Sequence, residues 1–260
     1  MVSPNETLDG MTLSVDPAEL SVDIGLPTGP LIPWQTSLSL AKTVKYCTER
    51  GIAVGVACIA GSSVVTWART KVLDTFLQGK ARHLFWIDSD IQWEPEQFLR
   101  LLALNTQYPV VCATYPQKTD EQTIVIRRQN LEHFEINPHG LIKVEGAGLG
   151  FTVITREVAE RISAAKPFVF DPVEQRRIRD VFRLDTVDRG REHPDIRHED
   201  MAFFADLLEL GYDIHLDLTI QLGHVGPKVY RADPLVALRL EDALRGAQDG
   251  HHHVPSPDVS

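Results

Sequence analysis

Two spacings of hydrophobic residues alternate along residues 20–116. Short apolar runs of strand length are separated by segments in which apolar residues recur every three or four positions, which is the spacing of an amphipathic helix. The predicted strands cover residues 20–29, 52–61, 83–87 and 109–116, and the predicted helices cover residues 34–51, 64–79 and 95–105. Strands that alternate with helices usually form a mostly parallel sheet covered on both faces, so this half of the chain predicts an α/β fold.

Individual residues indicate where the predicted helices begin and which predicted elements are buried. The run at 52–61 is apolar and predicts a buried strand. Ser62 and Ser63 are residue types that cap helix N-termini, and Pro95 suits the first turn of the helix that it opens. The helix over 64–79 is expected to face the sheet with Val65, Val72, Leu73, Phe76 and Leu77.

The second half of the chain has a different pattern. Residues 123–156 favour shorter antiparallel strands around a turn at 137–140, followed by a short helix. Residues 168–197 are charged and weakly periodic, which is typical of a functional loop or lid. We see no internal repeat and no sharp linker. The predicted organisation is a flexible arm over 1–18, one domain over 19–233, a helix over 234–246 and a disordered tail over 247–260.

Net charge and cysteine content indicate which partners and which cellular compartment to expect. A net charge of −10 gives no general attraction to nucleic acid or to anionic membranes, although a local basic groove is compatible with it. Cys47, Cys58 and Cys112 are odd in number, widely spaced and in apolar surroundings, so we expect buried thiols in a reducing compartment. The first ten residues do not resemble a signal peptide, and the most apolar stretch, 51–61, is too short to span a bilayer. These features predict a cytoplasmic protein with no transmembrane segment.

Two aspartates close the predicted strand at 83–87. Asp88 and Asp90 would project from one tight turn at the carboxyl end of a strand, where ligands of α/β sheets gather. Paired carboxylates suit Mg²⁺ or Mn²⁺, especially when phosphates complete the coordination shell. The alternative is a helix-capping turn in which Ser89 or Asp90 accepts backbone hydrogen bonds.

Three further residues carry chemistry at predicted element ends. His224 lies between glycines after a late strand and offers a nitrogen ligand, although a lone histidine is more often a hydrogen-bonded surface residue. Glu199 and Asp200 open the amphipathic helix over 199–211, where an acid either caps the helix or takes a proton from an acceptor hydroxyl.

Other candidates are a glycine-rich segment and two basic residues. The segment EGAGLGF at 145–151 permits close backbone approach to a ligand or forms a bulge. Arg69 and Lys118 follow predicted strands and either pair with a diphosphate or remain solvated. The histidines at 251–253 read as a non-catalytic tract in the tail.

Taken in order, these features resemble a GT-A type glycosyltransferase, particularly the small family-2-like or Anp1-like enzymes of bacteria and phages. The matching segments, spread over roughly residues 20–230, are VDIGLPTG (22–29), WAR (67–69), FWIDSDIQWEPE (85–96), YPQK (115–118), GAGLGF (146–151), HEDMAF (198–203) and GH (223–224). The resemblance implies a single α/β domain whose mostly parallel nucleotide-binding sheet carries a smaller antiparallel acceptor portion. It also implies a hexosyltransferase-type enzyme that uses a UDP- or GDP-linked sugar with Mn²⁺ or Mg²⁺.

The resemblance assigns roles by position. Asp90 would bind the metal, His224 would complete the metal site, and Asp88 would touch the ribose, the metal or a metal-bound water. Glu199 or Asp200 would be the base of an inverting mechanism. Nucleotide and donor contacts would fall to Pro27, Thr28, Gly29, Arg69, Asp88, Ser89 and Lys118, and the loop around the donor sugar and acceptor would be Gly146, Ala147, Gly148, Leu149 and Gly150. Thr70 departs from the asparagine that many relatives carry after that arginine, which affects the expected nucleotide contact.

Two other functions fit parts of this pattern. A metal-dependent nucleotidyltransferase would use a similar carboxylate-held metal, but the turn GLPTGP at 25–30 lacks a basic residue for phosphates. A non-catalytic module that binds sugar nucleotides or glycans would keep the fold without turnover.

The expected acceptor is a glycan, a lipid-linked sugar or a protein, and stereochemistry stays open because Anp1-like relatives retain configuration. Modified DNA becomes an acceptor only if the arginines of 168–197 form a basic groove, namely Arg176, Arg177, Arg179, Arg183, Arg189, Arg191 and Arg197.

Overall fold

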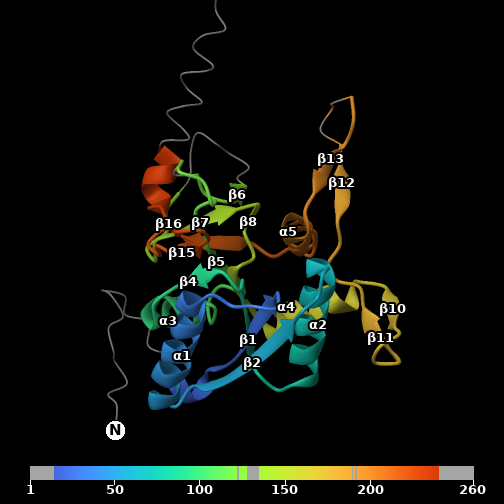
Figure 1. The fold of residues 1–260 in the computed structure, drawn as a ribbon, viewed down its shortest axis with the longest axis horizontal. Helices are drawn as coiled ribbons and strands as arrows, with labels where there is room; N and C mark the ends of the chain where they lie inside the picture. The colour runs from blue at the N-terminus through green and yellow to red at the C-terminus, as the bar shows by residue number, and fades with distance from the viewer. Residues whose placement is uncertain (1–14, 122, 128–134, 189, 191, 240–260) are drawn as a thin grey trace, which may run out of the picture.

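The structure is a computed structural model that describes residues 15–121, 123–127, 135–188, 190 and 192–239 (Figure 1). Within these residues the largest sheet has seven strands in the order β2-β1-β3-β9-β5-β14-β7. The strands are β1 (Ser21–Thr28), β2 (Ala53–Ala60), β3 (His83–Ile87), β5 (Val110–Ala113), β7 (Leu141–Val144), β9 (Phe151–Thr155) and β14 (Ile214–Asp217). Strands β9 and β7 run antiparallel to their neighbours, and the other five run in one direction.

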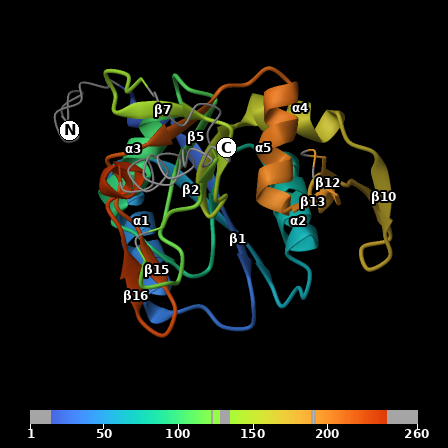
Figure 2. The same ribbon diagram turned by 90° about the horizontal axis from the view of Figure 1, so that it is seen from above.

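Helices cover both faces of this sheet (Figures 1 and 2). The helices are α1 (Trp34–Glu49) and α3 (Pro95–Leu104) on one face, and α2 (Val65–Gln78), α4 (Arg156–Ala164) and α5 (Glu199–Glu209) on the other. Alternate residues of β3 enter the two layers: Leu84 and Trp86 pack with α2, α4 and α5, whereas Phe85 and Ile87 pack with α1 and α3. A strand buried on both faces explains why HLFWI is apolar without alternation.

Strand β9 determines what lies beside the end of β3. It is inserted between β3 and β5, antiparallel to both, and pairs Phe151 with Ile87. The Asp88 backbone N–H then donates to the Gly150 carbonyl over 3.0 Å. The glycine-rich segment is therefore fixed next to the two aspartates.

A small antiparallel sheet places His224 at the same edge. It consists of β16 (Val229–Arg231), β15 (Gly223–Val225) and β4 (Ile91–Gln92), with His224 paired to Ile91. The Val225 N–H donates to the Asp90 carbonyl over 2.7 Å. A second pair joins β6 (Ile126–Arg127) to β8 (Gly146–Ala147).

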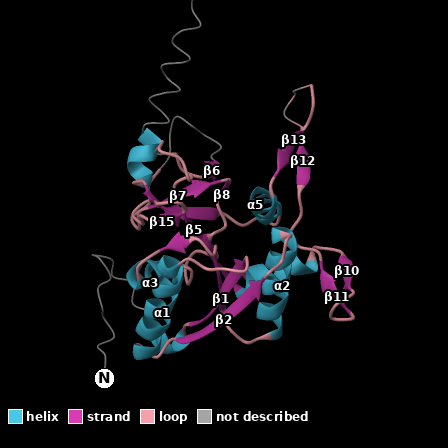
Figure 3. Cartoon of the chain, viewed as in Figure 1, coloured by secondary structure: helices cyan, strands magenta, loops and turns pink. Residues whose placement is uncertain are grey.

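The described part of 168–197 forms two β-hairpins that project from the sheet layers (Figure 3). They are β10 (Phe168–Asp171) with β11 (Arg176–Arg179), and β12 (Asp185–Val187) with β13 (Asp195–Arg197). Three of the arginines counted toward a basic groove are paired with acids instead: Arg176 with Asp74, Arg183 with Asp206 and Arg197 with Asp185. Arg189 and Arg191 lie outside the described residues.

The predicted fold class is confirmed: the chain is α/β, with a mostly parallel central sheet flanked by helices and smaller antiparallel parts. Pro95 begins α3 as expected, inside a capping box of Glu94 and Gln97. The turn at 137–140 is also present, with Gly140 at φ +78°.

Three local predictions are wrong. Strand β2 is an edge strand, hydrogen-bonded to β1 alone among the described strands, and its residues are exposed or half-buried: Val56 is 46% exposed and Cys58 is an exposed thiol. Helix α2 begins at Val65 without a serine cap, because Ser62 Oγ contacts Val64 in the preceding turn. Val65 itself is 45% exposed, while the other four predicted sheet-facing residues pack against the core.

The ends of the chain are described in part. Of the arm expected over 1–18, residues 1–14 lie outside the described residues, and a short 3₁₀ helix, η1 (Pro17–Glu19), follows. Residues 234–239 are helical, and the rest of the predicted helix and tail, 240–260, is also outside. Within the described part of the chain no helix is long and apolar enough to cross a membrane. The single domain over 19–233 stays a prediction.

Candidate functional site

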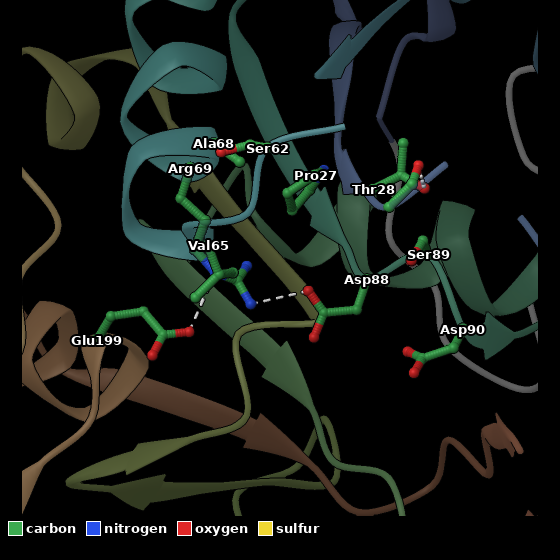
Figure 4. A pocket seen from close by; sticks show the side chains of 11 residues that line it. Pro27, Thr28, Ser62, Val65, Ala68, Arg69, Asp88, Ser89, Asp90 and Glu199 are labelled. Carbon is green, nitrogen blue, oxygen red and sulfur yellow. Dashed lines mark hydrogen bonds and ion pairs between the residues drawn. The ribbon is translucent and has the colours of Figure 1, made fainter. Parts of the chain in front are cut away.

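A cavity of about 340 Å³ opens at the carboxyl ends of β1 and β3, beside the first turns of α2 and α5 (Figure 4). Its lining residues are Pro27, Thr28, Gly29, Ser62, Val65, Ala68, Arg69, Asp88, Ser89, Asp90 and Glu199. Eight of these eleven were expected from the sequence to contact a donor, a metal or an acceptor. Ser62, Val65 and Ala68 were not, because nothing in their residue types marks them as site residues.

Arg69 is the charged centre of this cavity. Its side chain is 4% exposed, and Nη2 donates to Asp88 Oδ1 over 2.8 Å. Nε lies 3.5 Å from Glu199 Oε1, and Nη1 has no hydrogen-bond partner among the described residues. Burial opposes the charge, but the carboxylates of Asp88 and Glu199 outweigh it and raise the pKa of Arg69. A buried guanidinium that lines a cavity is suited to an anionic ligand.

Asp88 is held from its other side by Tyr115, a residue that the sequence did not identify. The hydroxyl of the buried Tyr115 donates to Asp88 Oδ2 and accepts the Gly150 N–H, both over 3.3 Å. Burial and the charge of Asp88 raise the pKa of Tyr115 well above 10, so the phenol stays neutral and can donate. The sequence signal was weak, because a tyrosine at the end of a strand is common.

The glycines of 146–151 make room for these side chains. A Cβ at Gly148 would lie 2.3 Å from the Tyr115 hydroxyl, and a Cβ at Gly150 would lie 2.5 Å from Asp88 Oδ2. Gly146 similarly faces Met201 and Phe204 of α5. Ala147 and Leu149 are buried in the core. The loop thus packs behind Asp88, and its predicted contact with donor sugar and acceptor stays a prediction.

Asp90 has different neighbours. Lys118 Nζ lies 2.5 Å from Asp90 Oδ2, and His224 Nε2 lies 3.4 Å from the same oxygen. Burial disfavours the charge on Asp90, but hydrogen bonds from His224 and Lys118 and their charges outweigh it and lower its pKa to about 2. Lys118 and Asp90 remain about one-third exposed, at 37% and 30% of their side chains. Ser89, between the two aspartates, lines the cavity.

The orientation of His224 bears on what Asp90 can bind. His224 Nδ1 lies 2.8 Å from the Pro116 carbonyl oxygen, which only accepts hydrogen bonds, so Nδ1 carries a proton. A doubly protonated His224 donates from Nε2 to Asp90 Oδ2, which is the contact that lowers the pKa of Asp90, whereas a neutral His224 presents the lone pair of Nε2 toward that oxygen. In the neutral state of His224 these two acceptors, 3.4 Å apart, would suit a shared cation. A histidine whose other nitrogen donates to a backbone carbonyl is also the usual arrangement of a metal ligand.

The predicted metal site is therefore brought together only in part. Among the described residues no group of three or more His, Cys, Asp or Glu side chains is placed to hold a metal. Asp90 and His224 fit a shared cation, and phosphate oxygens or water would supply the other ligands. Asp88 points to Arg69 instead (Figure 4), so its contact with a metal or a ribose stays a prediction.

The two acids that open α5 have distinct surroundings. Glu199 reaches the cavity and pairs with Arg69. Asp200 is partly buried, and its Oδ1 accepts the Met201 N–H over 2.7 Å. Burial and the neighbouring charge of Glu199 raise the pKa of Asp200. A carboxylate with a raised pKa is more basic than an ordinary aspartate and is better suited to accept a proton.

Comparison with known proteins gives similarity of fold. No protein-family model and no curated protein matches the chain. The crystal structure of A197 from STIV matches with a TM-score of 0.54 and 20% sequence identity, over 83% of this chain and 90% of that one. The crystal structure of GalNAc-T7 with UDP, GalNAc and Mn²⁺ has a TM-score of 0.46 and 11% identity, over 93% of this chain and 52% of that one. The likeness to A197 is one of fold alone, and it agrees with the α/β arrangement expected from the sequence.

Proposed function

We propose that the chain is a metal-dependent glycosyltransferase of GT-A type, which moves a hexose from a nucleotide-diphosphate donor to an acceptor hydroxyl. The observation that carries the proposal is the approach of His224 Nε2 to within 3.4 Å of Asp90 Oδ2, at the rim of a cavity lined by the buried cation Arg69. Mn²⁺ suits this mixed oxygen and nitrogen pair, and Mg²⁺ is the alternative. The cavity at the ends of β1 and β3 lies where nucleotides bind to open α/β sheets.

The chain's own residues divide the work of binding the donor. Pro27, Thr28 and Gly29 border the base at the end of β1, and the positive charge of Arg69 attracts the diphosphate. Asp88, fixed by Arg69 and Tyr115, accepts a hydrogen bond from the ribose. Asp90 and His224 would hold a divalent ion, which would supply Lewis-acid stabilisation of the charge that develops on the leaving diphosphate.

Transfer needs a base as well as a leaving group. The acceptor oxygen bonds to the anomeric carbon, the bond from that carbon to the phosphate oxygen breaks, and the acceptor proton moves to Asp200 in an inverting reaction. Because Asp200 must be ionised, the rate falls as the pH drops through its raised pKa. Asp200→Asn is expected to lower the transfer rate by about 10²–10⁴-fold and to remove this acid limb. An unchanged pH profile in Asp200→Asn would exclude it as the base.

Thermal shifts with nucleotide sugars test the proposal. UDP- and GDP-linked sugars are added one at a time, with and without Mn²⁺. One donor is expected to raise Tm by about 5 °C or more, and only when metal is present. Asp90→Asn should lose the shift, whereas Asp213→Asn, which changes an exposed acid paired with Lys143, should keep it.

The rival functions give other results in the same assays. Release of pyrophosphate from a nucleoside triphosphate, with no sugar transfer, would identify a nucleotidyltransferase. Donor binding without transfer to any acceptor or to water would identify a binding module. Equal shifts with and without metal would contradict the metal site.

A further inference from the structure

We propose that Lys118 is a displaceable counter-ion of Asp90, which makes binding of the metal depend on binding of the nucleotide diphosphate. This inference rests on the proposed function. It concerns a property beyond it, namely the coupling between two ligands of one site.

One oxygen atom of Asp90 has two nitrogen neighbours. Asp90 Oδ2 is approached both by Lys118 Nζ, at 2.5 Å, and by His224 Nε2, at 3.4 Å. A cation that bridges Asp90 and His224 must share this oxygen with the ammonium or replace it. Two positive charges a few ångströms apart repel each other strongly in a half-buried site, so replacement is favoured. In the protein without nucleotide, Lys118 therefore competes with the metal.

Lys118 has room to move. Its side chain is 37% exposed, and its stem lies against Gly226, where an added Cβ would be 3.3 Å from Cδ. It belongs to the segment after β5, whose backbone is fixed by the bridge between Pro116 and Ile124 and by the Gln117 N–H donating to the Thr123 carbonyl. The backbone is thus held in place while the ammonium group can rotate away from Asp90.

A diphosphate supplies what the displaced ammonium needs. Lys118 that leaves Asp90 loses an anionic partner, and a phosphate oxygen beside Asp90 provides another. The same phosphate contributes ligands to the metal, because Asp90 and His224 alone leave most of its coordination shell open. Metal and diphosphate therefore strengthen each other's binding, and by linkage the factor is the same in both directions.

The test is a Mn²⁺ titration followed by electron paramagnetic resonance of free Mn²⁺, on the full chain, with and without UDP or GDP. The Mn²⁺–nucleotide chelate is measured first in protein-free solution and subtracted. Without nucleotide, Lys118→Met is expected to bind Mn²⁺ about tenfold more tightly than wild type. Adding UDP or GDP should increase the affinity for Mn²⁺ strongly in wild type and less strongly in Lys118→Met.

Two matched variants complete the design. Lys143→Met removes an exposed lysine paired with Asp213 and should behave as wild type. Lys118→Gln keeps a polar side chain without the charge and should behave as Lys118→Met, which separates charge from folding effects. Equal Mn²⁺ affinity in wild type and both Lys118 variants, with unchanged coupling to nucleotide, would overturn the inference and leave the proposed function standing. Absence of bound Mn²⁺ in every variant, with nucleotide present, would overturn both.

Discussion

Asp88 and Asp90 are two residues apart at the end of one strand, yet their surroundings differ. Asp88 is enclosed by Arg69, Tyr115 and the Gly150 backbone, and each contact comes from an element packed into the core. Asp90 faces Lys118 and His224 at a more open rim. The partners of Asp88 are fixed in place, whereas the ammonium beside Asp90 can exchange.

This difference separates two tasks that one Asp-Ser-Asp turn performs. A carboxylate with buried, complementary partners keeps one orientation and is suited to position a ligand. A carboxylate with an exposed, exchangeable partner is suited to bind a cation that arrives with its substrate. The task of each acid therefore depends more on the elements that surround it than on the spacing of the two acids in the sequence.

Arg69→Met should give the largest effect on the Asp88 side. It leaves Asp88 and Glu199 without the buried cation between them, which is expected to lower the free energy of unfolding by about 3 kcal/mol. Urea denaturation measures this loss. Lys42→Met, which breaks the exposed pair with Glu94, is the control and should change stability by less than about 1 kcal/mol. Similar losses in both variants would remove the distinction between buried and exposed pairs.

Gly150→Ala tests the enclosure of Asp88 sterically. The added methyl would lie 2.5 Å from Asp88 Oδ2 and 2.8 Å from the Tyr115 hydroxyl, so Asp88 must shift. We expect a stability loss of about 1–3 kcal/mol together with weaker donor binding. Gly29→Ala is the matched control, since nothing lies within 4 Å of its Cβ. Calorimetric unfolding of both variants checks the contrast, and a neutral Gly150→Ala would contradict the packing described.

Tyr115→Phe removes one hydroxyl from the same network. It leaves Asp88 Oδ2 and the Gly150 N–H without this partner, which is expected to cost about 1 kcal/mol. Donor affinity should weaken as well, because Asp88 loses one of the groups that orient it. Isothermal titration with the donor found by thermal shift measures that change. Unchanged affinity would mean that Tyr115 supports the fold without positioning Asp88.

On the Asp90 side, the expected effect is a dependence of stability on pH. Its pKa falls from about 3.8 in an unfolded chain to about 2 in the folded one, so its ionised form stabilises the fold above pH 4. That contribution is lost as the pH falls from about 4 through 2. The stability difference between wild type and Asp90→Asn should shrink over this interval in denaturation experiments. A constant difference would show that the charge of Asp90 is not stabilised by its neighbours.

Much of the fold was readable from the sequence, because amphipathic helices and apolar strands leave strong periodic signals in residues 20–116. The insertion of β9 beside β3 was not, since strand pairing between distant segments leaves no local trace. Exposure of Cys58 was missed for a related reason: an apolar run does not show whether its strand lies at an edge of the sheet.

The sequence predicted which types of residue form the candidate site, but not which of them contact each other. The acids, Arg69 and His224 were visible as functional groups at element ends. That Tyr115 supports Asp88, and that Lys118 lies on Asp90, depends on distances that only the folded chain defines.

Anomalous diffraction at the manganese edge, from crystals grown with Mn²⁺ and UDP, shows whether Asp90 and His224 share a cation. We expect one strong peak between Asp90 Oδ2 and His224 Nε2, with Lys118 Nζ displaced from Asp90 toward a phosphate oxygen. A nucleotide bound in the cavity with no manganese peak beside Asp90 and His224 would contradict it.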